Sequence, residues 1–335
     1  MMNRKSWILT VALAISTPAL AQKADNHYLT DFLYPELGAP EQNVDCSIFF
    51  EKRGRRGPQQ GLEMYGKYIF SVEDGGNVNV YDFRKKTLEP LASFALASSM
   101  PDNHANNVEF GVEKKKGASF PLMYVSVGKV GVDIEWLCFV ESITRKGKTF
   151  SSEIAQTIHL DGSNWKDFGY KPIFGAPSWL VDKERGYLWV FSAKQRTVAK
   201  VTKDPKDNEY IATKFRIPKL SEGKDVYLSG KDILAQVVFP YEVWFTQAGC
   251  IHDGKIFYGY GIGKKDPTRP SRIRVYDTDT GKIAARYELQ DQIEFEIEDI
   301  VIRDGWMYVN ANNNPKKTDL PPYIYKVSLP AFMKK

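Results

Sequence analysis

The feature that most constrains the fold of this chain is a weak internal repeat of short, strand-like segments. Aromatic and β-branched residues gather in short runs, and Gly, Asp, Asn and Pro separate these runs. Each copy opens with a small or polar residue before an apolar segment, and a Gly-containing turn and an aromatic-rich segment follow. The copies begin at Gln59, Asn106, Ala176, Gln247 and Glu296. No long window combines a helical apolar period with helix caps, so the sequence predicts an all-β protein with few helices.

The predicted strands fall into four groups of four and one group of three. They are residues 59–65, 66–72, 77–83 and 90–96; 106–112, 121–127, 135–143 and 153–160; 176–182, 186–192, 197–203 and 211–217; 247–253, 254–261, 272–278 and 282–289; and 296–304, 305–311 and 323–329. The last group lacks a fourth strand, and residues 46–51 (CSIFFE) form a predicted strand without a partner of its own. Pairing the two would join the ends of the chain and remove the open edges of a linear array. The sequence therefore predicts a closed ring of five four-stranded units.

Short motifs in two units resemble those of a known superfamily. Residues 275–277 (VYD) precede Gly281 and Lys282, and residues 80–82 (VYD) precede Lys85 and Lys86. These turns resemble the repeats of YVTN- and quinoprotein-type members of the β-propeller superfamily, and the likeness extends over nearly all of residues 45–335. The resemblance implies a single β-propeller domain with five four-stranded blades, the last closed by the N-terminal strand, and no particular activity. A pair of β-sandwiches and a six-bladed propeller are the alternative folds.

Residues 1–21 have the three parts of a secretory signal. Arg4 and Lys5 give a positive start, residues 7–15 form a short apolar run, and residues 19–21 (ALA) form an A-x-A cleavage site. No later stretch reaches about 18 consecutive apolar residues, so no membrane span is expected. The predicted organisation is a signal peptide at 1–21, an N-terminal extension at 22–44 and the propeller at 45–335. Such a protein is exported to the periplasm or to the medium.

Charge and cysteine content narrow the classes of partner and cofactor. A formal net charge of +5 gives no reason to expect nucleic acid, and a monomer is expected. Cys46, Cys138 and Cys250 allow at most one disulfide, whose pairing stays open, and their apolar surroundings favour buried free thiols. Because the sequence has no C-x-x-C spacing and its histidines are scattered, we expect no zinc site and no cofactor.

The residues that lead into the first strand of each unit are the predicted site. In a propeller these strands line the central channel, and the loops that enter them lie on one face. The polar residues there are Gln59, Gln60, His104, Asn106, Asn107, Ser178, Gln247, Glu298 and Asp299. Amides and carboxylates suit a sugar, whose hydroxyls both donate and accept hydrogen bonds. The alternative is a water-filled channel with a solvated polar rim.

Two further features favour an acidic oligosaccharide as the ligand. The long connections at residues 161–175 and 219–246 are rich in aromatic residues, of which Trp165 and Trp244 are candidate stacking platforms for a sugar face. Cationic residues gather in loops of the same face, and arginine suits carboxylate, sulfate or phosphate groups. They are Arg53, Arg55, Arg56, Lys264, Lys265, Arg269, Arg272, Lys316 and Lys317. Arg55 is the one we assign to ligand binding.

The sequence leaves open whether the protein is an enzyme. His104 with Glu298 or Glu296 could provide acid–base chemistry, so a polysaccharide lyase or glycoside hydrolase on the same face is the second hypothesis. Glu296 and Glu298 share a strand face and could, with Asn106 and Gln247, instead bind a cation such as Ca²⁺ in the channel. A scaffold that holds a protein partner in the cell envelope is the third hypothesis. Signatures such as G-x-S-x-G and H-E-x-x-H are absent from the sequence.

Overall fold

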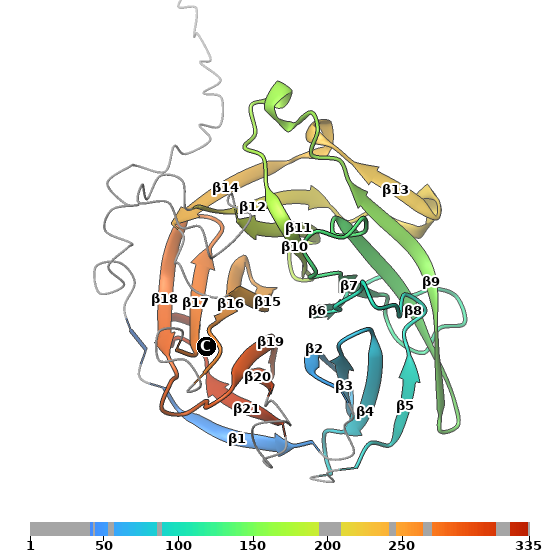
Figure 1. The fold of residues 1–335 in the computed structure, drawn as a ribbon, viewed down its shortest axis with the longest axis vertical. Coiled ribbons are helices and arrows are strands. Elements are labelled where there is room, and N and C mark those ends of the chain that lie inside the picture. Colours follow the sequence, from blue (N-terminus) through green and yellow to red (C-terminus); the bar gives the residue numbers. More distant parts are fainter. Residues whose placement is uncertain are drawn as a thin grey trace, which may run out of the picture.

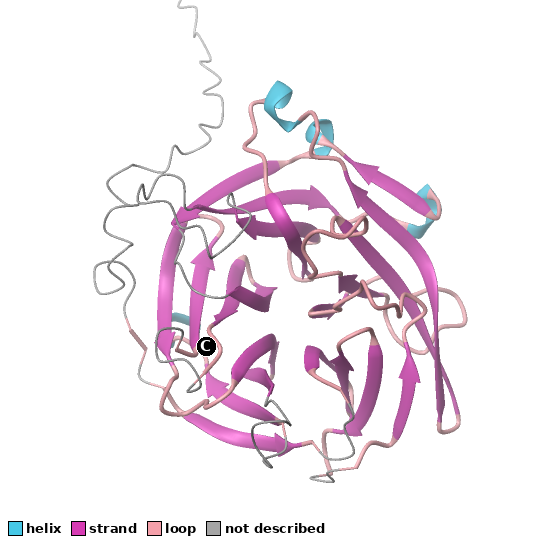
Figure 2. Cartoon of the chain, viewed as in Figure 1, coloured by secondary structure: helices cyan, strands magenta, loops and turns pink. Residues whose placement is uncertain are grey.

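The protein is an all-β, five-bladed β-propeller. The computed structural model describes residues 41–42, 44–52, 57–85, 89–193, 209–240, 246–263, 270–312 and 322–333. These residues form five sheets arranged in a ring around a central axis (Figure 1). Strands dominate, and the helical segments described are short 3₁₀ turns on the periphery (Figure 2). The predicted fold class and blade number are confirmed.

Each blade is a meander whose first strand lies innermost. Blade 1 consists of β2 (Gln59–Tyr65), β3 (Tyr68–Glu73), β4 (Asn77–Asp82) and β5 (Ala92–Ala95). Blade 2 consists of β6 (Asn107–Phe110), β7 (Met123–Ser126), β8 (Leu137–Lys146) and β9 (Thr149–Leu160), with β13 (Asp225–Leu228) added outside. Blade 3 consists of β10 (Phe174–Asp182), β11 (Tyr187–Ala193), β12 (Glu209–Arg216) and β14 (Ala235–Pro240). Blade 4 consists of β15 (Thr246–His252), β16 (Lys255–Tyr260), β17 (Arg272–Asp277) and β18 (Lys282–Glu288).

Blade 5 joins the two ends of the described chain, as the sequence predicts. It consists of β19 (Glu296–Arg303), β20 (Trp306–Asn312), β21 (Tyr323–Ser328) and the N-terminal β1 (Cys46–Glu51). β1 pairs antiparallel with β21, from Cys46 opposite Val327 to Glu51 opposite Tyr323. Of the predicted signal and extension, only residues 41, 42 and 44 are described. Glu41 forms an isolated bridge with Arg286 of blade 4.

Blade 3 departs from the prediction in its outer half. The segment expected to be its fourth strand, residues 211–217, belongs to β12 and is the third strand, while residues 197–203 lie outside the described residues. The fourth strand is β14, which lies within the connection expected to be a loop on the channel face. Its residues 235–239 (AQVVF) include two valines and Phe239, whose buried ring packs in the core. Branched and aromatic side chains of this kind favour a strand over a loop.

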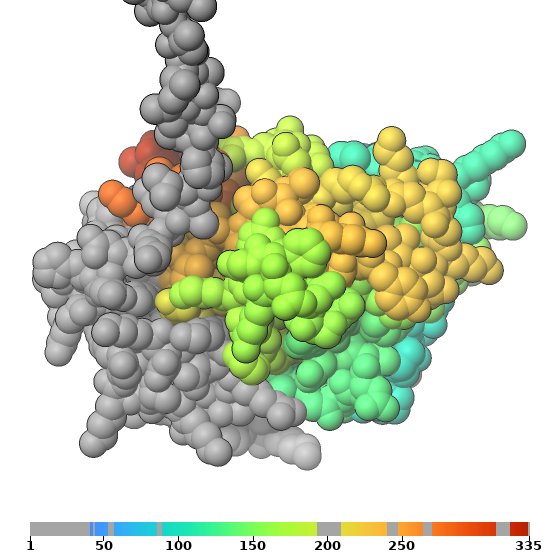
Figure 3. All heavy atoms as spheres, turned by 90° about the horizontal axis from the view of Figure 1, so that it is seen from above, coloured from blue at the N-terminus to red at the C-terminus, as the bar shows by residue number. Residues whose placement is uncertain are grey.

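The connection between β12 and β14 also crosses to the neighbouring blade. Its β13 pairs in parallel with β9 of blade 2, with Asp225 opposite Thr157. A short 3₁₀ turn, η6 (Gly230–Asp232), follows, and its Gly230 N–H donates to the side-chain oxygen of Asn164 at 2.9 Å. Figure 3 shows this outer wall, where the gold segment lies against the yellow-green residues that precede β10. The connection therefore links blades 2 and 3 on the outside of the ring.

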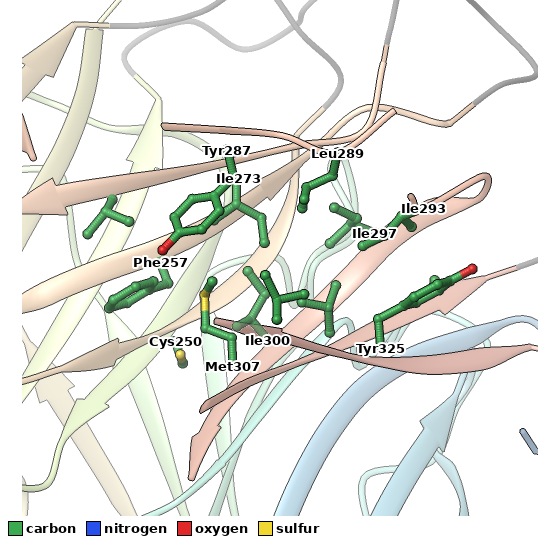
Figure 4. Packing of buried hydrophobic residues seen from close by; sticks show 14 of the residues in the cluster. Cys250, Phe257, Ile273, Tyr287, Leu289, Ile293, Ile297, Ile300, Met307 and Tyr325 are labelled. Carbon is green, nitrogen blue, oxygen red and sulfur yellow. The ribbon is translucent and has the colours of Figure 1, made fainter. Parts of the chain in front are cut away.

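Five hydrophobic clusters hold the ring together, one at each junction between blades. The junction of blades 4 and 5 illustrates the pattern, because Phe257 and Ile273 of blade 4 face Ile297, Ile300 and Met307 of blade 5 (Figure 4). Since each sheet lies between two others, its central strands are buried on both faces and are apolar almost throughout. This explains why the strand-like runs in the sequence alternate so little.

Other sequence expectations concern cysteines and the membrane. All three cysteines are free, with Cys138 and Cys250 buried and Cys46 half-buried. Burial raises the pKa of each thiol, so these groups are held in their neutral form. In the described part of the chain, we find no helix with the length and apolar character needed to cross a membrane.

Candidate functional site at the axis of the ring

The five inner strands β2, β6, β10, β15 and β19 surround the axis of the ring (Figure 1), and each carries polar residues. We call the end where the preceding loop leads into each inner strand the loop end. The hairpin end is the end where that strand turns into the second strand of its blade. Most of the polar residues predicted for the site are buried, namely Gln59, Gln60, Asn106, Asn107, Ser178, Gln247, Glu298 and Asp299. Their hydrogen-bond partners therefore determine what each can do.

Asp299, in β19, connects three blades. Its Oδ2 accepts hydrogen bonds from the backbone N–H groups of Leu62 at 2.9 Å and Val108 at 3.4 Å, in blades 1 and 2. Its Oδ1 accepts a hydrogen bond from the side-chain amide of Asn107 at 3.2 Å. Burial raises the pKa of Asp299, and these N–H donors act against that shift. The acceptor capacity of Asp299 is thus largely used in holding blades 5, 1 and 2 together.

The same device recurs at the next two junctions. Oε2 of Glu63 in β2 accepts a hydrogen bond from the N–H of Phe110 in β6 at 2.6 Å. Oε2 of Glu109 in β6 accepts one from the N–H of Val181 in β10 at 2.7 Å. An innermost strand has one edge without a neighbouring strand, so its buried N–H groups need other partners. Carboxylates on the inner strands act as cross-links between blades, a role that the sequence analysis did not assign.

Asn107 extends the network across the axis. Besides its contact with Asp299, its amide nitrogen donates to the carbonyl oxygen of Gly249 in blade 4 at 2.6 Å. Its Oδ1 accepts a hydrogen bond from Ser126 at 3.1 Å, and Ser126 accepts one from the N–H of Trp179 in blade 3 at 2.8 Å. These bonds make Asn107 a structural centre of the ring.

Lys52, directly after β1, is a buried cation near the loop end. Its Nζ donates to Oγ of Ser71 at 3.1 Å and to Oδ1 of Asn310. Ser71 in turn donates to Oε1 of Gln59 at 2.8 Å. Gln59 therefore belongs to a network that fixes the closing strand to blades 1 and 5.

Glu298 is the most informative carboxyl group at the loop end. Burial, and then the neighbouring Glu296, raises the pKa of Glu298 well above its ordinary value. A hydrogen bond from Asn312 and the charge of Lys52 act in the opposite direction. Glu296 itself accepts a hydrogen bond from the side chain of Gln247. The buried Glu298 carboxyl is thus biased toward its protonated form, in which it can both donate and accept a hydrogen bond.

Three buried acceptor oxygens near the loop end have no hydrogen-bond partner among the described residues. They are Oε1 of Gln60, Oδ1 of Asn106 and Oε2 of Glu298, on blades 1, 2 and 5. An unpaired buried polar group costs about 1–3 kcal/mol, and native proteins usually satisfy such groups with water or ligand. Within the predicted polar set, these three oxygens are therefore the acceptors whose partners are still to be supplied by water or by a ligand.

His104 lies outside this buried set. Its Nδ1 is 2.7 Å from Oδ1 of Asp74, and the two side chains are 34% and 43% exposed. The pair connects the β3–β4 turn to the loop before β6. The predicted catalytic residues His104, Glu296 and Glu298 therefore bond to three different neighbours.

The prediction of Trp165 as an exposed stacking platform is wrong. Its side chain is fully buried at the start of the 3₁₀ turn η2 (Trp165–Phe168), with its ring centroid 6.3 Å from that of Phe215. A large indole surface gains more from packing under the outer wall than from exposure. Trp244 and Arg55 lie outside the described residues.

Most residues of the predicted cationic surface lie outside the described residues. Of its members, Arg272 is described, and its Nε lies 2.6 Å from a carboxylate oxygen of Glu288. The remaining members lie outside the described residues, namely Arg53, Arg56, Lys264, Lys265, Arg269, Lys316 and Lys317. Ser178 has a structural partner, since its hydroxyl is 3.0 Å from that of Tyr258.

The hairpin end holds a charge cluster that the sequence analysis missed. Lys183 Nζ lies 3.0 Å from Oε2 of Glu63, whose side chain is 1% exposed against 37% for Lys183. Burial acts to lower the pKa of Lys183, but the Glu63 and Glu109 carboxylates outweigh it and raise that pKa. A hydrogen bond from His252 lowers the pKa of Glu184 to about 2. Lys183 and Glu184 lie in the turn after β10, and only the closed ring brings them to Glu63 and His252.

Metal binding can be examined for the described part of the chain. There, no group of three or more His, Cys, Asp or Glu side chains is arranged to hold a metal ion. The Ca²⁺ site predicted from Glu296 and Glu298 stays a prediction.

Comparison with known proteins supports the fold. No protein-family model matches the sequence, and no curated protein matches it. A Staphylococcus aureus phage tail fibre is 11% identical, with 85% of this chain and 53% of that chain covered and a TM-score of 0.50. Glutaminyl cyclase from Myxococcus xanthus is 14% identical over 84% of this chain and 95% of its own (TM-score 0.43). A β-propeller domain from Myceliophteria thermophila is 11% identical over 77% and 82% (TM-score 0.37). Of these three, the phage tail fibre reaches a TM-score of 0.50 and at 11% identity supports the fold alone, and the likeness to YVTN- and quinoprotein-type repeats stays a prediction.

Proposed function

We propose that this protein is an exported propeller that binds an oligosaccharide at the loop end of its axis. The observation that carries the proposal is the set of three buried oxygens, on Gln60, Asn106 and Glu298, without a partner among the described residues. Each needs a hydrogen-bond donor, and a sugar presents several hydroxyl donors in a small volume. Their position on three different blades suits a ligand that contacts several blades at once.

The chemistry of these groups suits hydroxyls. A side-chain amide offers an NH₂ donor beside its oxygen, so Gln60 and Asn106 can each complement a hydroxyl that both donates and accepts. Glu298 in its protonated form has the same dual character. A neutral hydroxyl also avoids the cost of placing a charge against the buried Glu298 carboxyl and its neighbour Glu296.

The preference for an acidic oligosaccharide is a finer part of the proposal. It rests on the cationic loop residues of the sequence, and Arg55 is the member assigned to the ligand. A guanidinium can hold a carboxylate or sulfate of the sugar with two parallel hydrogen bonds. In this proposal the buried acceptors hold the sugar hydroxyls, and Arg55 selects the acidic group.

The test is titration calorimetry of the protein with matched neutral and acidic oligosaccharides. We expect Gln60→Ala and Asn106→Ala to weaken binding of both classes about tenfold, because each removes a buried hydrogen-bonding group. Arg55→Ala should weaken only the acidic class. The control is Gln292→Ala, an exposed glutamine in the loop before β19, which should bind like the parent protein.

Three outcomes would reject the proposal or a part of it. Full affinity in both Gln60→Ala and Asn106→Ala would mean that the ligand does not bind at the proposed site. Equal loss of both classes in Arg55→Ala would remove the acidic preference. Mass spectrometry of the same mixtures would show new fragments if the protein cleaved the sugar, and the lyase or hydrolase hypothesis would then replace simple binding.

A further inference from the structure

A large cavity lies at the hairpin end between blades 4 and 5, on the opposite side from the proposed sugar site. Its volume is about 1010 Å³. The turns of the two blades contribute Asp253 and Asp304, each followed by glycine and each with a positive φ, of 47° and 49°. Such Asp-Gly turns match the twist of a β-hairpin and project both carboxylates at this end. Trp306 and the half-exposed Phe332 add apolar surface to the same wall.

The wall of this cavity is predominantly acidic. Its acidic residues are Asp45, Glu184 and the two turn aspartates. Lys255 is the one ammonium group in the described part of this wall. Lys255 is engaged elsewhere, because its Nζ lies 3.3 Å from a carboxylate oxygen of Asp277. The cavity therefore offers a negative field to a ligand.

Some of these carboxylates already have cationic neighbours. Asp253 lies 3.4 Å from Arg185, and Asp304 lies 3.0 Å from Arg303. Both aspartates are well exposed, so these pairs are weak and leave acceptor positions free. The backbone of Asp45 is bonded to Ser328, and its carboxylate has no partner among the described residues.

A second observation points independently to a ligand. A smaller cavity of about 90 Å³ shares Glu184 and His252 with the larger one, and its wall also holds Glu109 and Lys183, whose ammonium group is paired with Glu63. Glu109 is 4% exposed, and its Oε1 has no hydrogen-bond partner among the described residues, although its Oε2 is bonded to Val181. A buried acceptor in the wall of a small cavity is a position for a donor from water or from a ligand.

We propose that these two neighbouring cavities bind an organic cation with a primary ammonium group, of the kind that a lysine-containing peptide presents. The ammonium donates to the free Oε1 of Glu109 or to the carboxylates of Asp45, Asp253 and Asp304. The aliphatic part of the side chain lies along Trp306 and Phe332, as lysine stems do on aromatic surface. This site is separate from the sugar site at the loop end and does not depend on it.

Calorimetric titration with the peptide trilysine tests the proposal. The matched probe is trilysine acetylated on its side-chain amines, which keeps the shape and removes those charges. We expect trilysine to bind, the acetylated peptide to bind at least about tenfold more weakly, and 0.5 M salt to reduce the difference.

The protein variants sharpen the test. The triple variant Asp45→Asn, Asp253→Asn, Asp304→Asn should weaken trilysine binding about tenfold, and asparagine tolerates the positive φ of the two turns. The control is Asp102→Asn with Asp291→Asn, which removes two exposed carboxylates at the loop end. Glu109→Gln keeps a carbonyl oxygen as acceptor and should change the affinity by no more than about twofold, because burial raises the pKa of Glu109 and favours its neutral form.

Three results would each overturn the proposal. They are equal binding of the two peptides, an unchanged affinity in the triple variant, and no binding of trilysine at millimolar concentration. If Glu109→Gln does not fold, the proposal is still tested by the comparison of trilysine with its acetylated form and by the triple variant. Neither of these changes a residue in the protein interior. Oligosaccharide binding by the triple variant should stay unchanged, so the two sites fail or succeed separately.

Discussion

The loop end and the hairpin end of the ring use polar residues in different ways. From the loop end to the middle of the axis, Gln59, Asn107 and Asp299 take part in hydrogen bonds between different blades. At the hairpin end, charged residues form ion pairs beside cavities, as Lys183 and Glu63 do. The difference shows that a polar residue on an inner strand first accepts hydrogen bonds from the unpaired backbone N–H groups of the inner strand of another blade. A ligand site is marked by the polar atoms that remain after those edges are satisfied.

The largest loss of stability is expected where one side chain accepts hydrogen bonds from the largest number of inner strands. Asp299→Ala leaves the N–H groups of Leu62 and Val108 without this acceptor and removes one of the two acceptors of the Asn107 amide. The free energy of unfolding should fall by about 3 kcal/mol or more, since each buried unpaired donor costs about 1–3 kcal/mol. Urea denaturation measures the loss, with Asp291→Ala at an exposed site as the control. A loss below about 1 kcal/mol would mean that Asp299 is available to a ligand after all.

A smaller loss is expected from the ion pair at the hairpin end. Lys183→Met keeps most of the side-chain length and leaves the Glu63 carboxylate, which is 1% exposed, without its cation. We expect about 1–2 kcal/mol of destabilisation, because the pair is buried on one side and open to water on the other. Lys183→Arg restores the charge and should recover most of the loss. If the Met and Arg variants are equally stable, the packing of the Lys183 side chain rather than its charge accounts for its contribution to stability.

Much of this architecture could be predicted because strand patterns are local. The turn before Lys255 and the strand from Cys46 to Glu51 are each determined by a few contiguous residues. Both lie where the sequence predicts them. The outer part of blade 3 could not be predicted in the same way. β14 is separated from β12 by β13, which pairs with another blade, and a repeat search does not anticipate such an excursion.

The candidate site was predicted less well because its chemistry depends on distant contacts. Polarity singled out Asp299 and Asn107, yet their partners lie on other blades and make them structural. The charge cluster of Lys183 with Glu63 joins residues that are far apart in sequence, and nothing in either local segment indicates the pair. Trp165 is buried because residues distant in sequence, among them Phe215 and Leu228, pack in the same cluster.

Two glutamates at the hairpin end should respond to pH in opposite directions. Burial raises the pKa of Glu109, so the folded chain holds a proton that the unfolded chain releases above about pH 4.5. Stability is lost as pH rises from that point, and Glu109→Gln should flatten the loss. A hydrogen bond from His252 lowers the pKa of Glu184 to about 2, so its stabilisation is present above about pH 4.5 and is lost as pH falls toward 2. Urea denaturation of Glu109→Gln and Glu184→Gln across pH 2–8 checks both signs, and an unchanged profile for either variant would contradict its assignment.

The smallest effect is expected at His104, the residue that the sequence most favoured for catalysis. Its contact with Asp74 is a partly exposed pair, and such pairs contribute roughly 0.2–1 kcal/mol. His104→Ala should therefore change the free energy of unfolding by no more than about 0.5 kcal/mol and leave oligosaccharide affinity within about twofold. A loss of binding comparable to that in Gln60→Ala would place the ligand on the surface loops instead of on the buried acceptors. A loss of stability comparable to that in Asp299→Ala would mean that the loop end is held by its outer turns as strongly as by the side chains at the axis.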